Sequence, residues 1–287
     1  QGVMDLLSLN ASLENIGDAL QVDLTGNETA DLDGQLDTAN VFFAGHSLGA
    51  ITGLTYAAVN NSIASNTSIA DKEVNLIKAV MLANPGGQLP KLLENSPSFS
   101  AKILPGLEAA AGLTQGMADL EKFFTVFQGP LDSTDPVNFT DLLISTDTPV
   151  LMFEMVGGGL VNATDSNLAT TGLPDTLIAA GGYPADTVVP NHANPALNDV
   201  PTGKSYLAGT DPLIAQLELA TVTASITPTA DNLMIVSKLK EGTHGTISSA
   251  DAYTVFVEMI GQTTSFFQTG GKGLTVGDAD QLAPAAE

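Results

Sequence analysis

The sequence predicts an α/β fold with a mostly parallel sheet flanked by helices. Four short apolar runs have the length of buried strands, and segments with helical periodicity lie between them. Such alternation is typical of α/β domains. The chain has 287 residues, 44% of them hydrophobic, which is enough for one large domain or two small ones with a substantial core.

The elements follow from local patterns. A first helix is expected over about 3–20, where apolar residues recur at helical spacing without a capping residue ahead of them. A helix is expected at 50–59, followed by a loop at 60–68, and the last helix at 250–267. The four expected strands are 41–44, 76–83, 149–156 and 233–237.

A long excursion at 88–147 separates the second and third strands. Its middle carries an amphipathic stripe made of Leu113, Met117, Leu120, Phe124 and Phe127. This stripe predicts either a helix that faces the core or a helical cap or lid over an apolar substrate site. The expected division is an α/β core segment at 1–87, a helical cap at 88–147, a second core segment at 148–270 and a flexible tail at 271–287.

Composition excludes several classes of function. The net charge is −23, with nine Lys and no Arg, so neither nucleic acid nor an anionic membrane surface is an expected partner. The absence of Cys excludes disulfides, thiolate zinc sites and a Cys nucleophile. Three scattered His residues make a poor metal site, so no metal or cofactor is expected, although calcium is left open.

The stretch VFFAGHSLGA, at 41–50, contains a Gly-x-Ser-x-Gly motif centred on Ser47. The expected strand before it and helix after it match the strand–turn–helix in which such a serine is a nucleophile. The flanking glycines leave room for strand and helix to approach each other. The backbone N–H of Leu48, at the helix start, is then one donor of an oxyanion hole.

A serine nucleophile needs a general base, and the chain offers three histidines. His46 adjoins the serine and is expected to face away from it, and His192 lies in a Pro/Asn loop typical of a surface histidine. His244 lies in EGTHGTISS, after the fourth strand, at the sheet edge where ligands bind in α/β folds. We therefore predict His244 as the base.

The third member should be an acid between serine and histidine in chain order. Asp186, in YPADTVVPN after the third strand, is the best candidate to orient the His244 imidazole. The order Ser, Asp, His is that of the α/β-hydrolases. The competing acids are Asp165, Asp175, Asp199 and Asp211.

Six segments together carry a resemblance to a known family. DLLSLNASLENI, VFFAGHSLGAITG, AVMLANPGGQLPKLLENSPSF, PADTVVPN, LAGTDPLI and EGTHGTISS resemble the large extracellular lipases of Gram-negative bacteria, the virulence-factor lipases of the α/β-hydrolase superfamily. The resemblance implies a secreted or cell-surface bacterial lipase that cleaves acyl esters with Ser47, Asp186 and His244. The residues expected to contact the substrate are His46, Leu113, Met117, Leu120 and Phe124.

The sequence departs from that family in one respect. Such enzymes have several strands and a His-Gly oxyanion loop before the turn that carries the nucleophilic serine. The only His-Gly in this sequence is His244–Gly245. The chain is therefore expected to be the C-terminal part of a longer hydrolase. The N-terminal part would be a second, noncovalently bound chain that supplies the other oxyanion donor.

Two other functions stay open at this point. A short-chain esterase or thioesterase would use the same three residues. A noncatalytic binding module of hydrolase fold belongs to a different class, since fold alone does not show function.

Overall fold

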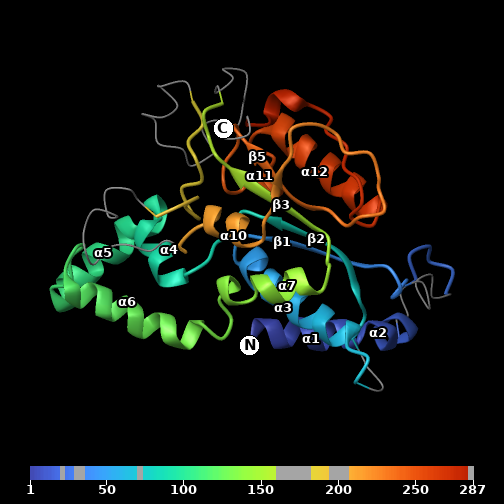
Figure 1. The fold of residues 1–287 in the computed structure, drawn as a ribbon, viewed down its shortest axis with the longest axis horizontal. Coiled ribbons are helices and arrows are strands. Elements are labelled where there is room, and N and C mark those ends of the chain that lie inside the picture. Colours follow the sequence, from blue (N-terminus) through green and yellow to red (C-terminus); the bar gives the residue numbers. More distant parts are fainter. Residues whose placement is uncertain (20–22, 29–35, 70–73, 160–181, 194–206, 284–287) are drawn as a thin grey trace.

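The computed structural model describes the chain except for residues 20–22, 29–35, 70–73, 160–181, 194–206 and 284–287. Its centre is a five-stranded sheet in the order β1-β2-β3-β5-β4, in which every pair of neighbours is parallel (Figure 1). The strands are β1 (Val41–His46), β2 (Ile77–Ala83), β3 (Val150–Met155), β4 (Ala220–Thr221) and β5 (Met234–Leu239).

Helices precede, connect and follow these strands. None of them, in the ranges that the structure describes, is both long and apolar enough to cross a bilayer. They are α1 (Gly2–Ala11), α2 (Leu13–Ala19), α3 (Leu48–Ser65), α4 (Leu89–Asn95), α5 (Pro97–Ala111), α6 (Ala118–Leu131), α7 (Thr140–Ser145), α10 (Asp211–Gln216), α11 (Thr246–Ser249) and α12 (Tyr253–Gln268), with 3₁₀ turns η1 (Pro136–Asn138) and η3 (Ala279–Gln281).

The sheet is buried between two layers of helices. Because successive side chains of a strand point to opposite faces, Val150 and Met152 of β3 pack with α3, α7 and α10, whereas Leu151 and Phe153 pack against α12. All six residues of β3 are buried. This double coverage explains why the strands appear in the sequence as continuous apolar runs.

The four strands expected from the sequence are all present, but other boundaries differ. The expected helix at 3–20 is two helices, α1 and α2, with Ser12 between them. The helix expected at 50–59 runs from Leu48 to Ser65, so most of the expected loop at 60–68 is helical. The two-residue strand β4 gave no signal in the sequence.

The segment expected to be a flexible tail, 271–287, is packed as far as Ala283. Leu274 pairs with Ile226 through backbone hydrogen bonds, and Leu282 is buried beside Leu239 of β5. The tail prediction is wrong for these residues because apolar side chains, spaced irregularly among glycines, still fill the α12 face of the core.

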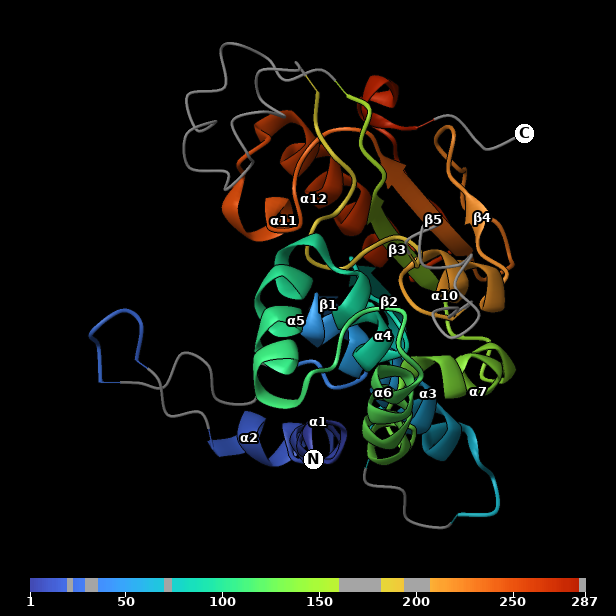
Figure 2. The ribbon, with the colours of Figure 1, turned by 90° about the vertical axis from the view of Figure 1, so that its left-hand side faces the viewer.

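The excursion at 88–147 divides into two parts. Helices α4, α5 and α6 project from the core, and α4 contacts both α5 and α6 (Figure 2). By contrast, α7 packs on α3 and its Leu143 belongs to the core. The amphipathic stripe is also interrupted: Leu113 follows the α5 cap and Met117 is the N-cap of α6. Helix α5 has no buried residue along its 15 residues.

Glycines permit a close contact between β1 and α3. A Cβ on Gly45 would lie 2.6 Å from the carbonyl oxygen of Gly49, and a Cβ on Gly53 would lie 2.1 Å from the Phe43 ring. The Cβ position of Gly49 itself is open. The sequence-based expectation that both motif glycines are required by packing therefore holds for Gly45 and not for Gly49.

We predict that Gly53→Ala destabilises the chain by about 1–3 kcal/mol, since the added methyl overlaps the Phe43 ring. Gly49→Ala is the matched control, one turn earlier in the same helix, and should be neutral or stabilising by up to about 1 kcal/mol. Urea denaturation of both variants measures the difference. Equal effects would contradict the packing that we describe.

Candidate active site

Ser47, Asp186 and His244 lie at one edge of the sheet. Ser47 directly follows β1, Asp186 follows β3 and His244 follows β5. Because these strands are parallel, their carboxyl ends meet at the same edge, where ligands bind in open α/β sheets. The topology thus gathers residues that are far apart in the sequence.

Ser47 occupies a strained turn between β1 and α3. Its φ of 55° and ψ of −124° are unusual for a residue other than glycine. The turn is held by its backbone N–H, which donates to the Ala83 carbonyl at 2.9 Å, and by its carbonyl, which accepts from Ala50 N. The Leu48 N–H opens the first turn of α3 and has no partner within the helix, so it is free to bind an oxyanion.

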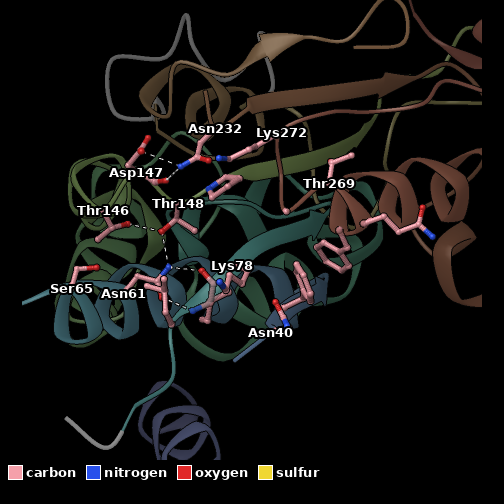
Figure 3. A pocket seen from close by; sticks show the side chains of 17 residues that line it. Asn40, Asn61, Ser65, Lys78, Thr146, Asp147, Thr148, Asn232, Thr269 and Lys272 are labelled. Atoms are coloured by element: carbon pink, nitrogen blue, oxygen red, sulfur yellow. Dashed lines mark hydrogen bonds between the residues drawn. The ribbon is translucent and has the colours of Figure 1, made fainter. Parts of the chain in front are cut away.

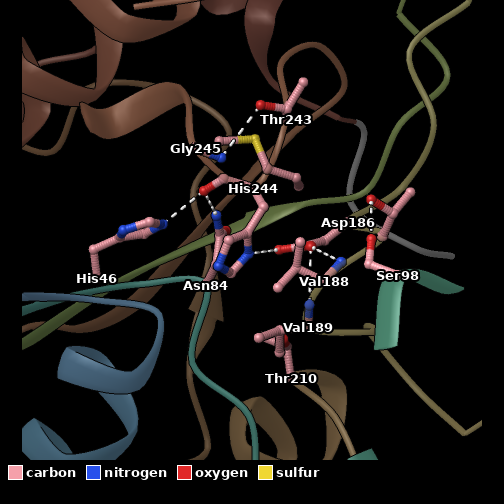
Figure 4. A network of polar contacts seen from close by, with 12 residues as sticks. His46, Asn84, Ser98, Asp186, Val188, Val189, Thr210, Thr243, His244 and Gly245 are labelled. Carbon is pink, nitrogen blue, oxygen red and sulfur yellow. Dashed lines mark hydrogen bonds and ion pairs between the residues drawn. The ribbon is translucent and has the colours of Figure 1, made fainter. Parts of the chain in front are cut away.

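Asp186 is buried and firmly oriented. Its Oδ1 accepts the backbone N–H groups of Val188 at 2.8 Å and Val189 at 3.0 Å, and its own N–H donates to the Met155 carbonyl at 3.1 Å. Its Oδ2 lies 2.6 Å from His244 Nδ1 (Figure 4). This geometry fixes the imidazole with Nδ1–H as donor to the carboxylate.

The other ring nitrogen of His244 is available for chemistry. Nε2 is buried and has no hydrogen-bond partner among the residues that the structure describes, so the bond from Ser47 Oγ is not formed in this state. Catalytic hydrogen bonds of this kind often form only when substrate is bound. The arrangement leaves an oriented imidazole nitrogen that can take one proton.

The loop that carries His244 is anchored from Asp251, which the sequence did not point to. The carboxylate of Asp251 accepts the hydroxyl hydrogens of Thr243 and Thr246, one residue before and two after the histidine. It also accepts the backbone N–H of Ala252 at 2.9 Å. The signal available in the sequence was the position of this acid, two residues before the start of α12.

The side chain of His46, which was expected to face away from Ser47, contacts His244. Its Nε2 lies 2.6 Å from the carbonyl oxygen of His244, and the two rings are 4.8 Å apart. Asn84, which the sequence did not single out, donates from Nδ2 to the same carbonyl at 3.0 Å (Figure 4). Burial lowers the pKa of His46, which favours its neutral form.

Two of the weighed alternatives lie outside this constellation. His192 is exposed, and its Nδ1 lies 3.4 Å from Asp211, which in turn pairs with Lys238 at 2.9 Å. Neither residue reaches His244. The remaining competing acids, Asp165, Asp175 and Asp199, lie outside the described residues.

The cap residues expected to bind substrate are dispersed. Leu120 and Phe124 are buried in α6, whereas Met117 is 42% exposed. Leu113 is partly buried. Of these four, Phe124 lines an apolar groove between α4, α5 and α6 with a volume of about 240 Å³.

A larger cavity, of about 520 Å³, lies at the opposite edge of the sheet (Figure 3). Its walls come from the amino-terminal ends of strands and from the carboxyl ends of α3 and α12, and polar side chains such as Asn61, Lys78 and Asn232 line it. Because Ser47 and His244 are at the carboxyl edge, this cavity is not part of their site.

Glu154, near the end of β3, is a buried acid beside the candidate site. Its Oε2 lies 2.8 Å from Lys238 Nζ on β5. Burial, together with the nearby Asp211 charge, raises the pKa of Glu154 to about 7 against the opposing effect of Lys238. For Lys238, burial opposes the charge, but its bonds to Glu154 and Asp211 outweigh it and raise its pKa. Lys238 therefore stays cationic while Glu154 titrates.

No group of three or more His, Asp or Glu side chains in the described ranges is arranged to hold a metal ion. Comparisons with protein-family models, with curated proteins and with solved structures found no match to this chain.

We predict that Glu154→Gln changes the pH dependence of stability. A carboxyl whose pKa is raised by folding stabilises the folded chain most at low pH, and this contribution is lost as pH rises from about 4.5 through about 7. The variant should therefore gain, relative to the parent chain, on the order of 3 kcal/mol of unfolding free energy across that interval. Urea denaturation from pH 4 to pH 8 measures it.

Glu108→Gln, on exposed α5, removes the same charge without burial and is the matched control. A difference between Glu154→Gln and the parent chain that is constant across this pH range would contradict the raised pKa.

Proposed function

We propose that this chain is a serine-dependent carboxylic ester hydrolase of α/β-hydrolase fold, most specifically a lipase. One observation carries the proposal: a buried carboxylate orients an imidazole whose other nitrogen has no hydrogen-bond partner among the described residues, at the sheet edge that also holds a serine in a strained turn. The five-stranded parallel sheet between helices is compatible with that fold.

The proposed reaction proceeds through an acyl-enzyme. Ser47 Oγ attacks the ester carbonyl while His244 Nε2 takes its proton, and the same proton then goes to the leaving alcohol. Asp186 keeps the imidazole in the reactive tautomer and stabilises the imidazolium. Water, deprotonated by His244, releases the acid. The Leu48 N–H stabilises the oxyanion in both steps.

The apolar groove on α4–α6 supports an acyl chain as the substrate's main recognition element. Ile103 and Leu107 of α5 form one wall, and Phe123 and Phe127 of α6 face them. A cavity of about 150 Å³ holds benzene, so in proportion about 240 Å³ accommodates roughly ten acyl carbons.

Two contacts connect this groove to the candidate site. Leu93, in the groove wall, packs in a cluster with Ile51 of α3 and with Val189, which lies in the loop that carries Asp186. The start of α5 is bound to the residue after the acid, because Ser98 N–H donates to the Thr187 carbonyl at 2.8 Å and Ser96 Oγ donates to it at 3.1 Å. The start of α5 is therefore tied to the loop that carries Asp186.

The open edge of β1 supports a protein partner as part of this proposal. Within the described residues β1 pairs with β2 alone, and Ala44 in its middle is exposed. Helix α12, whose Phe267 stacks on Phe42 of β1, exposes Tyr253 and Val257 at 66% and 48%. Unpaired strand edges are places where another strand adds. The partner that we propose is the N-terminal part of the same hydrolase, which adds a strand there and brings the second oxyanion N–H.

We predict that a fluorophosphonate probe labels Ser47 in the chain. Ser47→Ala should not be labelled, and His244→Ala should react at least about 10³-fold more slowly because the base is lost. Asp186→Asn should lower kcat about 10⁴-fold. Intact-mass spectrometry and peptide mapping measure the labelling rate and the position labelled.

His192→Ala is the matched control, since that histidine is exposed and bonded away from the site. Labelling at a serine other than Ser47, or an unchanged rate in His244→Ala, would contradict the proposed mechanism. Ester turnover that rises when the N-terminal part is supplied supports the partner, and unchanged turnover argues against it.

We predict that p-nitrophenyl esters of eight to ten acyl carbons, roughly the capacity of the groove, are hydrolysed with higher kcat/KM than the acetate. Leu107→Ser should reduce kcat/KM about 10-fold for the longer esters and little for the acetate, since it removes apolar area from the groove wall alone. Val126→Ser is the control, because Val126 of α6 is 72% exposed. A preference for the acetate or for thioesters would indicate the alternative esterase or thioesterase.

A further inference from the structure

We infer that His46 and Asn84 are positioning residues, which hold the base histidine by its backbone carbonyl. This inference rests on the proposed function of His244. Asp186 fixes the imidazole ring, but ring position also depends on the backbone that carries it. The carbonyl oxygen of His244 accepts from His46 Nε2 at 2.6 Å and from Asn84 Nδ2 at 3.0 Å.

The two donors come from the ends of neighbouring strands. His46 is the last residue of β1 and pairs with Ala83, the last residue of β2. Asn84 is the next residue after Ala83, so both donors lie at the same ends of two paired strands. Ser47 is bound to the same place, because its N–H donates to the Ala83 carbonyl. The contacts that position the nucleophile and those that position the base therefore share one frame.

Asn84 has features that a merely structural residue does not need. Its φ is 52°, a conformation that asparagine adopts more readily than most residues. Its side-chain Oδ1 is buried with no hydrogen-bond partner within the described part of the chain, and such an unpaired acceptor is unfavourable. The contribution of the Asn84 amide is therefore its Nδ2 donor, which binds the His244 carbonyl.

His46 is suited to donate to this carbonyl while remaining neutral. The bond requires a hydrogen on Nε2, and lowering of its pKa by burial disfavours a second proton on Nδ1. A cation at this position would repel the imidazolium that His244 becomes during the reaction, since the rings are 4.8 Å apart. His46 therefore supports the base as a hydrogen-bond donor and leaves its basicity intact.

The test compares variants that remove or keep each donor. His46→Leu and Asn84→Gly remove one donor each, and glycine tolerates the positive φ of residue 84. His46→Gln keeps an amide N–H where Nε2 was. We expect kcat to fall about 10- to 100-fold in His46→Leu and in Asn84→Gly with little change in KM, and His46→Gln to recover most of the lost rate.

A second readout does not depend on turnover. The Nδ1–H proton of His244, bonded to Asp186, should give a downfield proton NMR resonance in the parent chain and in His46→Gln. The resonance should be broadened or lost in His46→Leu and in Asn84→Gly, while thermal unfolding shows that both variants remain folded.

The outcomes separate this inference from the proposed function. If the parent chain does not hydrolyse esters, the proposed function fails, while the NMR comparison still decides whether the two donors position His244. If His46→Leu and Asn84→Gly keep both the resonance and kcat, the inference is overturned. Equal losses in His46→Leu and His46→Gln would also overturn it, because the donor would then not matter. If Asn84→Gly unfolds, Asn84→Asp takes its place. It keeps the backbone preference of residue 84 but removes the donor, and it should show the same losses.

Discussion

Asp186 and His244 are 58 residues apart in the chain and are joined by one short hydrogen bond. That bond depends on the parallel pairing of β3 and β5, which ends both strands at the same edge and keeps Met155 opposite Leu239. The loop that carries Asp186 is bound to the end of β3, because the Asp186 N–H donates to the Met155 carbonyl. Every other feature of the candidate site is built around this edge.

The same edge contains the strained backbone of the molecule. Ser47 and Asn84 both have positive φ, and such conformations cost on the order of 1–3 kcal/mol each. They persist because the strands that lead into them are held in the core, where β3 is buried along its whole length and β2 nearly so. The buried sheet thus supports strained backbone at its end.

Helical periodicity in the excursion after β2 did not distinguish core from cap. Both α5 and α7 carry apolar residues, yet α5 has no buried residue and α7 contributes Leu143 to the core. Which helix is covered depends on what lies opposite it, and the sequence does not contain that information locally. The packed segment that ends with Leu282 was missed for the same reason. Helix α5, which has no buried residue and is anchored at Thr187, has little buried apolar contact to lose in local opening.

The sequence by itself determined four of the five described strands, the turn at Ser47 and the choice of Asp186 and His244. These are local signals: apolar runs, a spaced glycine pair and the order of residue types along the chain. The tertiary structure alone decided that His46 and Asn84 both donate to the carbonyl of His244. Both contacts bridge at least 160 residues, and they exist only because parallel strands bring separate loops to one edge.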